Sequence, residues 1–125
     1  MKPGSYIMII EDVADERDAA RLTLEIEGYA VRAFANGDEA LDYLRSAHAL
    51  PCMILLDLMM HGKNGWEFRT EQRQDARLAA IPVIVCSGDG RLSEKAEALG
   101  VITHLTKPID QKAFLAAVAR HCPND

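Results

Sequence analysis

The chain has 125 residues, and its 14 Lys and Arg against 19 Asp and Glu give a formal net charge of −5. Hydrophobic residues make up 49% and charged residues 26%, a balance that is typical of one folded domain and not of a disordered chain. The acidic balance argues against a nucleic-acid-binding surface, and the apolar stretches are too short to cross a membrane.

Short apolar runs alternate with helix-period segments five times along the chain. In chain order, we predict strand 6–10, helix 15–27, strand 30–35, helix 37–47, strand 52–56, helix 65–74, strand 82–86, helix 92–99, strand 103–106 and helix 111–121. Gly28 is placed to end the first helix, while Asn36 and Asp110 are candidate N-caps. This alternation predicts an α/β protein, with a parallel sheet that helices cover on both faces.

The chain contains three cysteines, Cys52, Cys86 and Cys122. Their odd number, the lack of a CxxC pair and the lack of a histidine at ligand spacing disfavour both a disulfide framework and a zinc site. Cys52 and Cys86 also lie beside apolar runs. We therefore expect small buried thiols in a reducing cytoplasm, and a cytoplasmic protein.

Polar side chains of complementary chemistry follow four of the predicted strands. Glu11 and Asp12 follow the first strand, Asp57 the third, Ser87 the fourth and Lys107 the fifth. Each has an ordinary explanation by itself, such as a turn or a helix start, but the carboxyl ends of parallel strands meet at one edge and form ligand sites there. Three carboxylates at such an edge need a cation, and oxygen ligands suit Mg²⁺ better than zinc.

Four segments carry a resemblance to the receiver domain of two-component response regulators, in particular to single-domain chemotaxis regulators. They are Ile9-Ile10-Glu11-Asp12, Leu55-Leu56-Asp57-Leu58-Met59-Met60 followed by Gly65, Val85-Cys86-Ser87-Gly88, and Leu105-Thr106-Lys107-Pro108. The resemblance spans about residues 5–122 and implies a flavodoxin-like, doubly wound sheet of five parallel strands in the order 2-1-3-4-5, with five helices. It implies a single receiver domain over residues 1–125, without an output domain on this chain.

The resemblance also implies a reaction. Asp57 is expected to accept a phosphoryl group from a phosphohistidine of a histidine kinase or a histidine phosphotransfer protein. Mg²⁺ is expected to be held by Asp12, Asp57 and the backbone carbonyl of Met59, with Glu11 acting through water. Such a domain catalyses only its own phosphorylation and dephosphorylation, so it is a signalling phosphoacceptor and not an enzyme in the usual sense.

The remaining roles implied by the resemblance concern the response to phosphorylation. Ser87 and Lys107 are expected to contact the phosphoryl group, and the Lys107-Pro108 peptide bond is expected to be cis. Ser87 and His104 are the expected switch residues, where His104 stands in place of the usual Tyr or Phe. The switch is expected to change a protein-binding face built from the fourth helix, fifth strand and fifth helix. Met59 and Asp89 occupy positions that tune the lifetime of the phosphate.

Three other functions can be compared with these residues. A haloacid-dehalogenase-type enzyme needs a second acid at position 59, where this chain has Met59, and a cap insertion for which 125 residues leave no space. A flavodoxin-type or dinucleotide-binding site needs a small, polar loop after the first strand, but Glu11 and Asp12 would repel phosphate there. A receiver-like interaction module that acts without phosphorylation stays open as the alternative; neither reading involves a nucleic acid or a membrane.

Overall fold

Five parallel strands form one sheet in the order β2-β1-β3-β4-β5, in a computed structural model that describes residues 5–123. The strands are β1 (Ile7–Ile10), β2 (Val31–Phe34), β3 (Met53–Asp57), β4 (Val83–Ser87) and β5 (Thr103–Thr106). The predicted sheet, its parallel pairing and its strand order are therefore confirmed.

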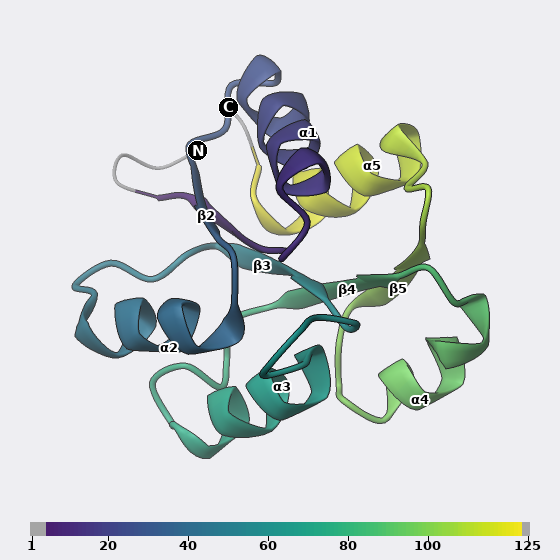
Figure 1. The fold of residues 1–125 in the computed structure, drawn as a ribbon. Coiled ribbons are helices and arrows are strands. Elements are labelled where there is room, and N and C mark those ends of the chain that lie inside the picture. The colour runs from purple at the N-terminus through teal and green to yellow at the C-terminus, as the bar shows by residue number, and fades with distance from the viewer. Residues whose placement is uncertain (1–4, 124–125) are drawn as a thin grey trace.

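Five α-helices connect the strands and cover both faces of the sheet. They are α1 (Ala14–Ile26), α2 (Gly37–Ser46), α3 (Gly65–Gln74), α4 (Ser93–Glu97) and α5 (Gln111–His121), and a short 3-10 helix, η1 (Gly90–Leu92), precedes α4. Helices α1 and α5 lie on one face, and α2, α3 and α4 lie on the other (Figure 1). The predicted bounds agree with these to within about two residues; η1 was not predicted.

The period-two alternation of the strands divides the core into two layers. Along β3, Met53 and Leu55 face the layer under α1 and α5, whereas Ile54 and Leu56 face the layer under α2, α3 and α4. Every residue of β1, β3 and β4 is buried, because these strands have a neighbour on each side and helices on both faces. The edge strands β2 and β5 are only partly buried.

Local interactions fix where the helices begin. The Asn36 side chain accepts a hydrogen bond from the Glu39 backbone N–H (2.8 Å) at the start of α2, and Asn64 and Glu67 form a reciprocal capping box at the start of α3. Gly65 allows α3 to begin directly against β3, because a Cβ there would lie only 2.7 Å from the Leu58 Cα. This close approach holds the loop after β3 in place.

The expectation of three free thiols is wrong. Cys52 and Cys122 form a disulfide, and only Cys86 is a buried free thiol as predicted. Cysteine spacing gave no sign of this pair because the two residues are 70 positions apart, yet their Cα atoms are 5.7 Å apart. They meet because the start of β3 and the end of α5 belong to the same layer of the core.

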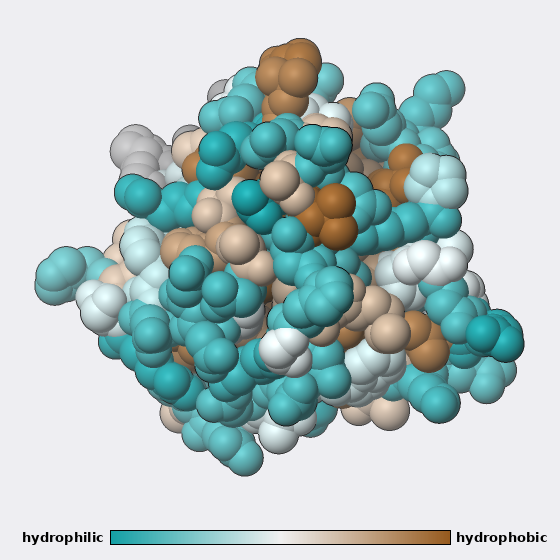
Figure 2. Space-filling model, in the orientation of Figure 1, coloured by the Kyte–Doolittle hydropathy of each residue, from teal (hydrophilic) through white to brown (hydrophobic). Residues whose placement is uncertain are grey.

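The surface is mainly hydrophilic on the face drawn in Figure 2, where hydrophobic residues occur as separate spots. Among residues 5–123, the large hydrophobic residues that are exposed are Val13, Leu22, Ile26, Met59 and Ile102. None of the helices within residues 5–123 is long and apolar enough to cross a membrane.

Candidate functional site

Three side chains from different strands meet at the carboxyl edge of the sheet. Glu11 directly follows β1, Asp57 ends β3, and Lys107 directly follows β5. The Lys107 Nζ donates to Glu11 Oε1 (2.6 Å) and to Asp57 Oδ2 (3.1 Å). Both carboxylates are buried, with 5% of Glu11 and 2% of Asp57 exposed. The predicted convergence of these residues is confirmed by the geometry.

A further carboxylate reaches the same ammonium group. Glu16, in the first turns of α1, accepts a hydrogen bond from the Lys107 Nζ through its Oε2 (3.1 Å) and is more exposed than Glu11. Sequence reasoning missed Glu16, although its place near the start of the helix that follows β1 is a signal that could have found it. The ammonium of Lys107 thus faces three carboxylates.

This excess of acid perturbs both titrating partners. Burial and the neighbouring Asp57 carboxylate raise the pKa of Glu11 to about 7, although the Lys107 ammonium acts in the opposite direction. Burial would lower the pKa of Lys107, but its bonds to Glu11 and Asp57 outweigh this and raise the pKa above its ordinary value. The pocket is therefore short of positive charge.

Asp12 lies beside this pocket but is turned toward a different partner. Its Oδ2 accepts a hydrogen bond from the His61 backbone N–H (2.9 Å) and lies 2.8 Å from the His61 Nδ1. Burial would raise the pKa of Asp12, but these two interactions lower it. The ligand atoms of Glu11, Asp57 and Cys86 lie within 4.8 Å of one another; within the described part of the chain, Asp12 is not in such a group. The direct metal contact of Asp12 stays a prediction.

His61 is the second residue that sequence reasoning missed as a contact. Its backbone N–H donates to Asp12, which a proline at this position could not do. The His61 side chain is fully exposed, at 102% of its reference area, and it contacts Asp12 through its Nδ1. No spacing pattern in the sequence indicates this contact, because Asp12 lies 49 positions earlier.

Ser87 and His104 are in direct contact. Ser87 ends β4 and is buried; its Oγ donates to the Asp89 backbone carbonyl (3.1 Å) and lies 2.9 Å from the His104 Nε2. The hydroxyl has one hydrogen, so it can donate to only one of these two partners at a time. The contact joins neighbouring strands, because in the register of β4 and β5 His104 pairs with Val85, two residues before Ser87. The expected switch residues therefore already face each other.

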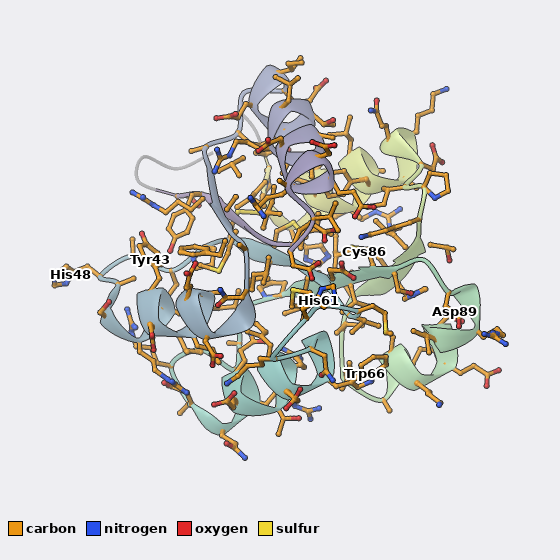
Figure 3. All side chains as sticks on the ribbon, in the orientation of Figure 1. Tyr43, His48, His61, Trp66, Cys86 and Asp89 are labelled. Carbon is orange, nitrogen blue, oxygen red and sulfur yellow. A yellow bond between two sulfur atoms is a disulfide. The ribbon has the colours of Figure 1, made fainter. Side chains whose placement is uncertain are left out.

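The two residues expected to tune phosphate lifetime point differently. The backbone N–H of Met59 donates to Asp57 Oδ1 (3.0 Å), while the residue as a whole is 61% exposed. Asp89 forms a salt bridge with Arg91 (2.9 Å), and the hydrogen bonds from Arg91 lower the pKa of Asp89 to about 2. In Figure 3, Asp89 lies on the side of the molecule where η1 leads into α4, whereas His61 and Cys86 lie near the middle of the molecule.

The remaining site prediction concerns the residue after Lys107. The Lys107-Pro108 peptide bond is cis, as the resemblance implied. The Lys107 backbone N–H also donates to the Ser87 carbonyl (2.8 Å), which ties the loop after β5 to the end of β4.

Comparison with known proteins agrees with this geometry. The family model described as response regulator receiver domain matches residues 7–119. PilH of Pseudomonas aeruginosa is 29% identical over 114 residues, covering 90% of this chain and 93% of that protein. The response regulator Rre1 of Synechocystis sp. is 30% identical over 115 residues, covering 90% of this chain and 49% of Rre1, so the chain spans about half the length of that relative.

Solved structures agree with the family. A response regulator receiver protein from Pseudomonas putida is 28% identical, with a TM-score of 0.86, over 96% of this chain and 99% of that one. The bacteriophytochrome response regulator RtBRR is 29% identical, with a TM-score of 0.83, over 97% of this chain and 80% of that one. The chain belongs to the family of response regulator receiver domains, which act in two-component signalling.

Proposed function

We propose that this chain is a phosphoacceptor, in which Asp57 takes a phosphoryl group from a phosphohistidine of a histidine kinase or a histidine phosphotransfer protein. The observation that carries the proposal is the pairing of the buried Asp57 carboxylate with Lys107 at 3.1 Å, beside Glu11. The other Asp57 oxygen accepts the Met59 N–H, so the carboxylate is held in one orientation. A nucleophile that is fixed next to a cation suits phosphoryl transfer by positioning.

The reaction exchanges one bond for another. A carboxylate oxygen of Asp57 forms a bond to phosphorus while the bond between phosphorus and the donor imidazole breaks, and the imidazole leaves as a neutral histidine once it is protonated. In this proposal Lys107 meets the charge on the phosphoryl oxygens, and the Ser87 hydroxyl does so after turning away from His104. The protein thus supplies orientation and positive charge.

The donor set fits Mg²⁺. Glu11 and Asp57 bring buried carboxylate oxygens within 4.8 Å of each other, the pocket holds more acid than base, and carboxylate oxygens suit this ion. We propose that Asp12, Asp57 and the Met59 carbonyl hold it, with Glu11 acting through water. When bound, Mg²⁺ supplies the positive charge that offsets the phosphoryl oxygens and the acidic pocket.

The proposed output begins at Ser87. Its hydroxyl donates to the Asp89 carbonyl and meets His104, so turning toward a phosphoryl group on Asp57 removes the partner of His104. His104 lies on β5, between α4 and α5 in the face proposed to bind a downstream protein. A coupling of ~1 to 3 kcal/mol would make this a shifted equilibrium between two states.

The proposed location is the cytoplasm. The expectation of free thiols no longer supports that location, because Cys52 and Cys122 form a disulfide. The proposal now rests on the phosphohistidine donors that the function requires.

The test uses acetyl phosphate as a small phosphodonor with Mg²⁺, followed by intact mass measurement. We expect one phosphoryl adduct on the natural chain and none on Asp57→Asn. Asp42→Asn, which removes an exposed carboxyl on α2, is the matched control and should retain the adduct. A folded natural chain without an adduct would instead support the interaction module that works without phosphorylation.

A further inference from the structure

The disulfide between Cys52 and Cys122 has no part in the proposed phosphoryl transfer. We propose that it is a reversible thiol–disulfide exchange site, at which a small thiol of the glutathione class or a dithiol reductase releases the last turn of α5. The proposal is independent of the phosphoacceptor function, because it rests on other residues at the other end of the sheet.

The position of the disulfide separates it from the acidic pocket. Cys52 directly precedes β3, and Cys122 is the C-cap of α5. Asp57 lies at the opposite end of β3, five residues after Cys52, which is about 16 Å at the rise of a strand. The disulfide can therefore open and close without a direct effect on the residues around Asp57.

Exposure decides which sulfur a thiol can reach. Cys52 is partly exposed, whereas Cys122 is only 3% exposed, so attack is expected at the Cys52 sulfur. The Cys122 sulfur then leaves as a thiolate and takes a proton. A second thiol resolves the mixed disulfide on Cys52, so that two reagent thiols become one reagent disulfide and the protein gains two thiols.

The surroundings of both sulfurs suit the reduced state as well. The Cys52 Sγ lies 3.4 Å from the Tyr6 carbonyl oxygen, which can accept a hydrogen bond from a thiol. Cys122 packs in the apolar layer under α1 and α5, where a thiol behaves as a small hydrophobic side chain. Reduction leaves no buried polar group without a partner at either position, so the fold is expected to survive it.

The last turn of α5 depends on the disulfide more than the rest of the helix does. Phe114, Ala117 and Val118 are buried and hold the earlier turns, but residues 119–121 are exposed. Cys122 is the only buried side chain of that turn, and its backbone N–H donates to the Val118 carbonyl (2.7 Å). Without the disulfide, one buried thiol holds a turn that is otherwise in solvent, and such a helix end frays.

Release of this turn would reach the face proposed for output. Arg120 lies in the last turn, and it lines a groove between β5 and α5 together with Ile102 and Leu105. Fraying of residues 119–122 would move Arg120 and change the shape and charge of that groove.

The experiment incubates the folded full-length chain with mixtures of reduced and oxidised glutathione, then alkylates free thiols and maps them by mass spectrometry. We expect Cys52 and Cys122 to become alkylated together without denaturant. Cys86 should stay unmodified, because it is buried and burial raises the pKa of its thiol.

Amide hydrogen exchange on the same samples measures the release. We expect residues 119–122 to exchange at least roughly ten-fold faster after reduction, while β1 and β3 stay unchanged. Cys52→Ser should show the fast exchange with or without glutathione, and Cys86→Ser should respond as the natural chain does. Should Cys52→Ser fail to fold, reduction of the natural chain alone supplies the comparison.

Three results would overturn the proposal. The first is alkylation of Cys52 and Cys122 in the folded chain before any glutathione is added, which means that no disulfide forms. The second is a disulfide that glutathione reduces only in denaturant, which makes it a purely structural cross-link. The third is complete reduction with no change in the exchange of residues 119–122.

Discussion

Glu11 should make the stability of the protein depend on pH in an unusual direction. Its pKa is raised from 4.5 to about 7 in the folded state, mainly by burial. A raised pKa means that folding favours the protonated form, so the stability associated with Glu11 is full below pH 4.5 and is lost as the pH rises through 7. The loss is about 3 kcal/mol, from a shift of about 2.5 pKa units at 1.36 kcal/mol per unit.

Glu11→Gln isolates this contribution, because glutamine does not titrate. Without Mg²⁺, the stability of Glu11→Gln relative to the natural chain should rise by about 3 kcal/mol between pH 4.5 and pH 8. Urea unfolding at a series of pH values measures this difference, and the titrating groups that do not contact Glu11 cancel because both chains share them. Glu25→Gln, which removes an exposed carboxyl on α1, is the control for charge loss alone.

The test depends on how the difference in unfolding free energy between Glu11→Gln and the natural chain changes with pH. A difference between Glu11→Gln and the natural chain that stays constant from pH 4.5 to pH 8 would refute the reasoning. It would mean that Lys107 fully compensates the burial of Glu11 and that the pocket is not short of positive charge.

Further predictions concern the same edge of the sheet. Lys107→Gln leaves two buried carboxylates without their ammonium and should lower the free energy of unfolding by about 3 kcal/mol in urea; an unchanged midpoint would count against the ion pairs. Gly65→Ala places a Cβ 2.7 Å from the Leu58 Cα and should destabilise the chain by about 2 kcal/mol in the same assay, a loss that would be absent if α3 could shift freely. His61→Pro removes both bonds to Asp12 and should raise the pKa of Asp12 more than His61→Ala does in an NMR titration, because alanine keeps the backbone donor; equal effects would exclude a role for the backbone.

Much of the fold could be predicted from the sequence because its signals are local. Uniformly apolar runs such as residues 53–56 indicate strands that are buried on both faces, and the caps Asn36 and Asp110 mark helix starts that the structure confirms. The strand order and the cis bond before Pro108 came from the resemblance and not from periodicity. The convergence of Glu11, Asp57 and Lys107 followed from one topological rule about the carboxyl ends of parallel strands.

The parts that could not be predicted depend on side-chain direction and on distant packing. Asp12 turns to His61, a contact between residues 49 positions apart that no spacing rule reveals. The reach of Glu16 to Lys107 depends on how α1 lies against the loop after β5. Cys52 and Cys122 meet only because β3 and α5 share a layer, so arithmetic on cysteine spacing excluded a bond that forms.

The most direct test of Asp57 as a phosphoacceptor locates the phosphoryl group. The folded chain is incubated with acetyl phosphate with Mg²⁺ or with a chelator, and the modified peptide is sequenced by tandem mass spectrometry. We expect a phosphoryl group on Asp57 that forms with Mg²⁺ and does not form with the chelator. A phosphoryl group on any other residue, or none on the folded chain in the presence of Mg²⁺, would contradict the claim that this pocket is a phosphoacceptor site.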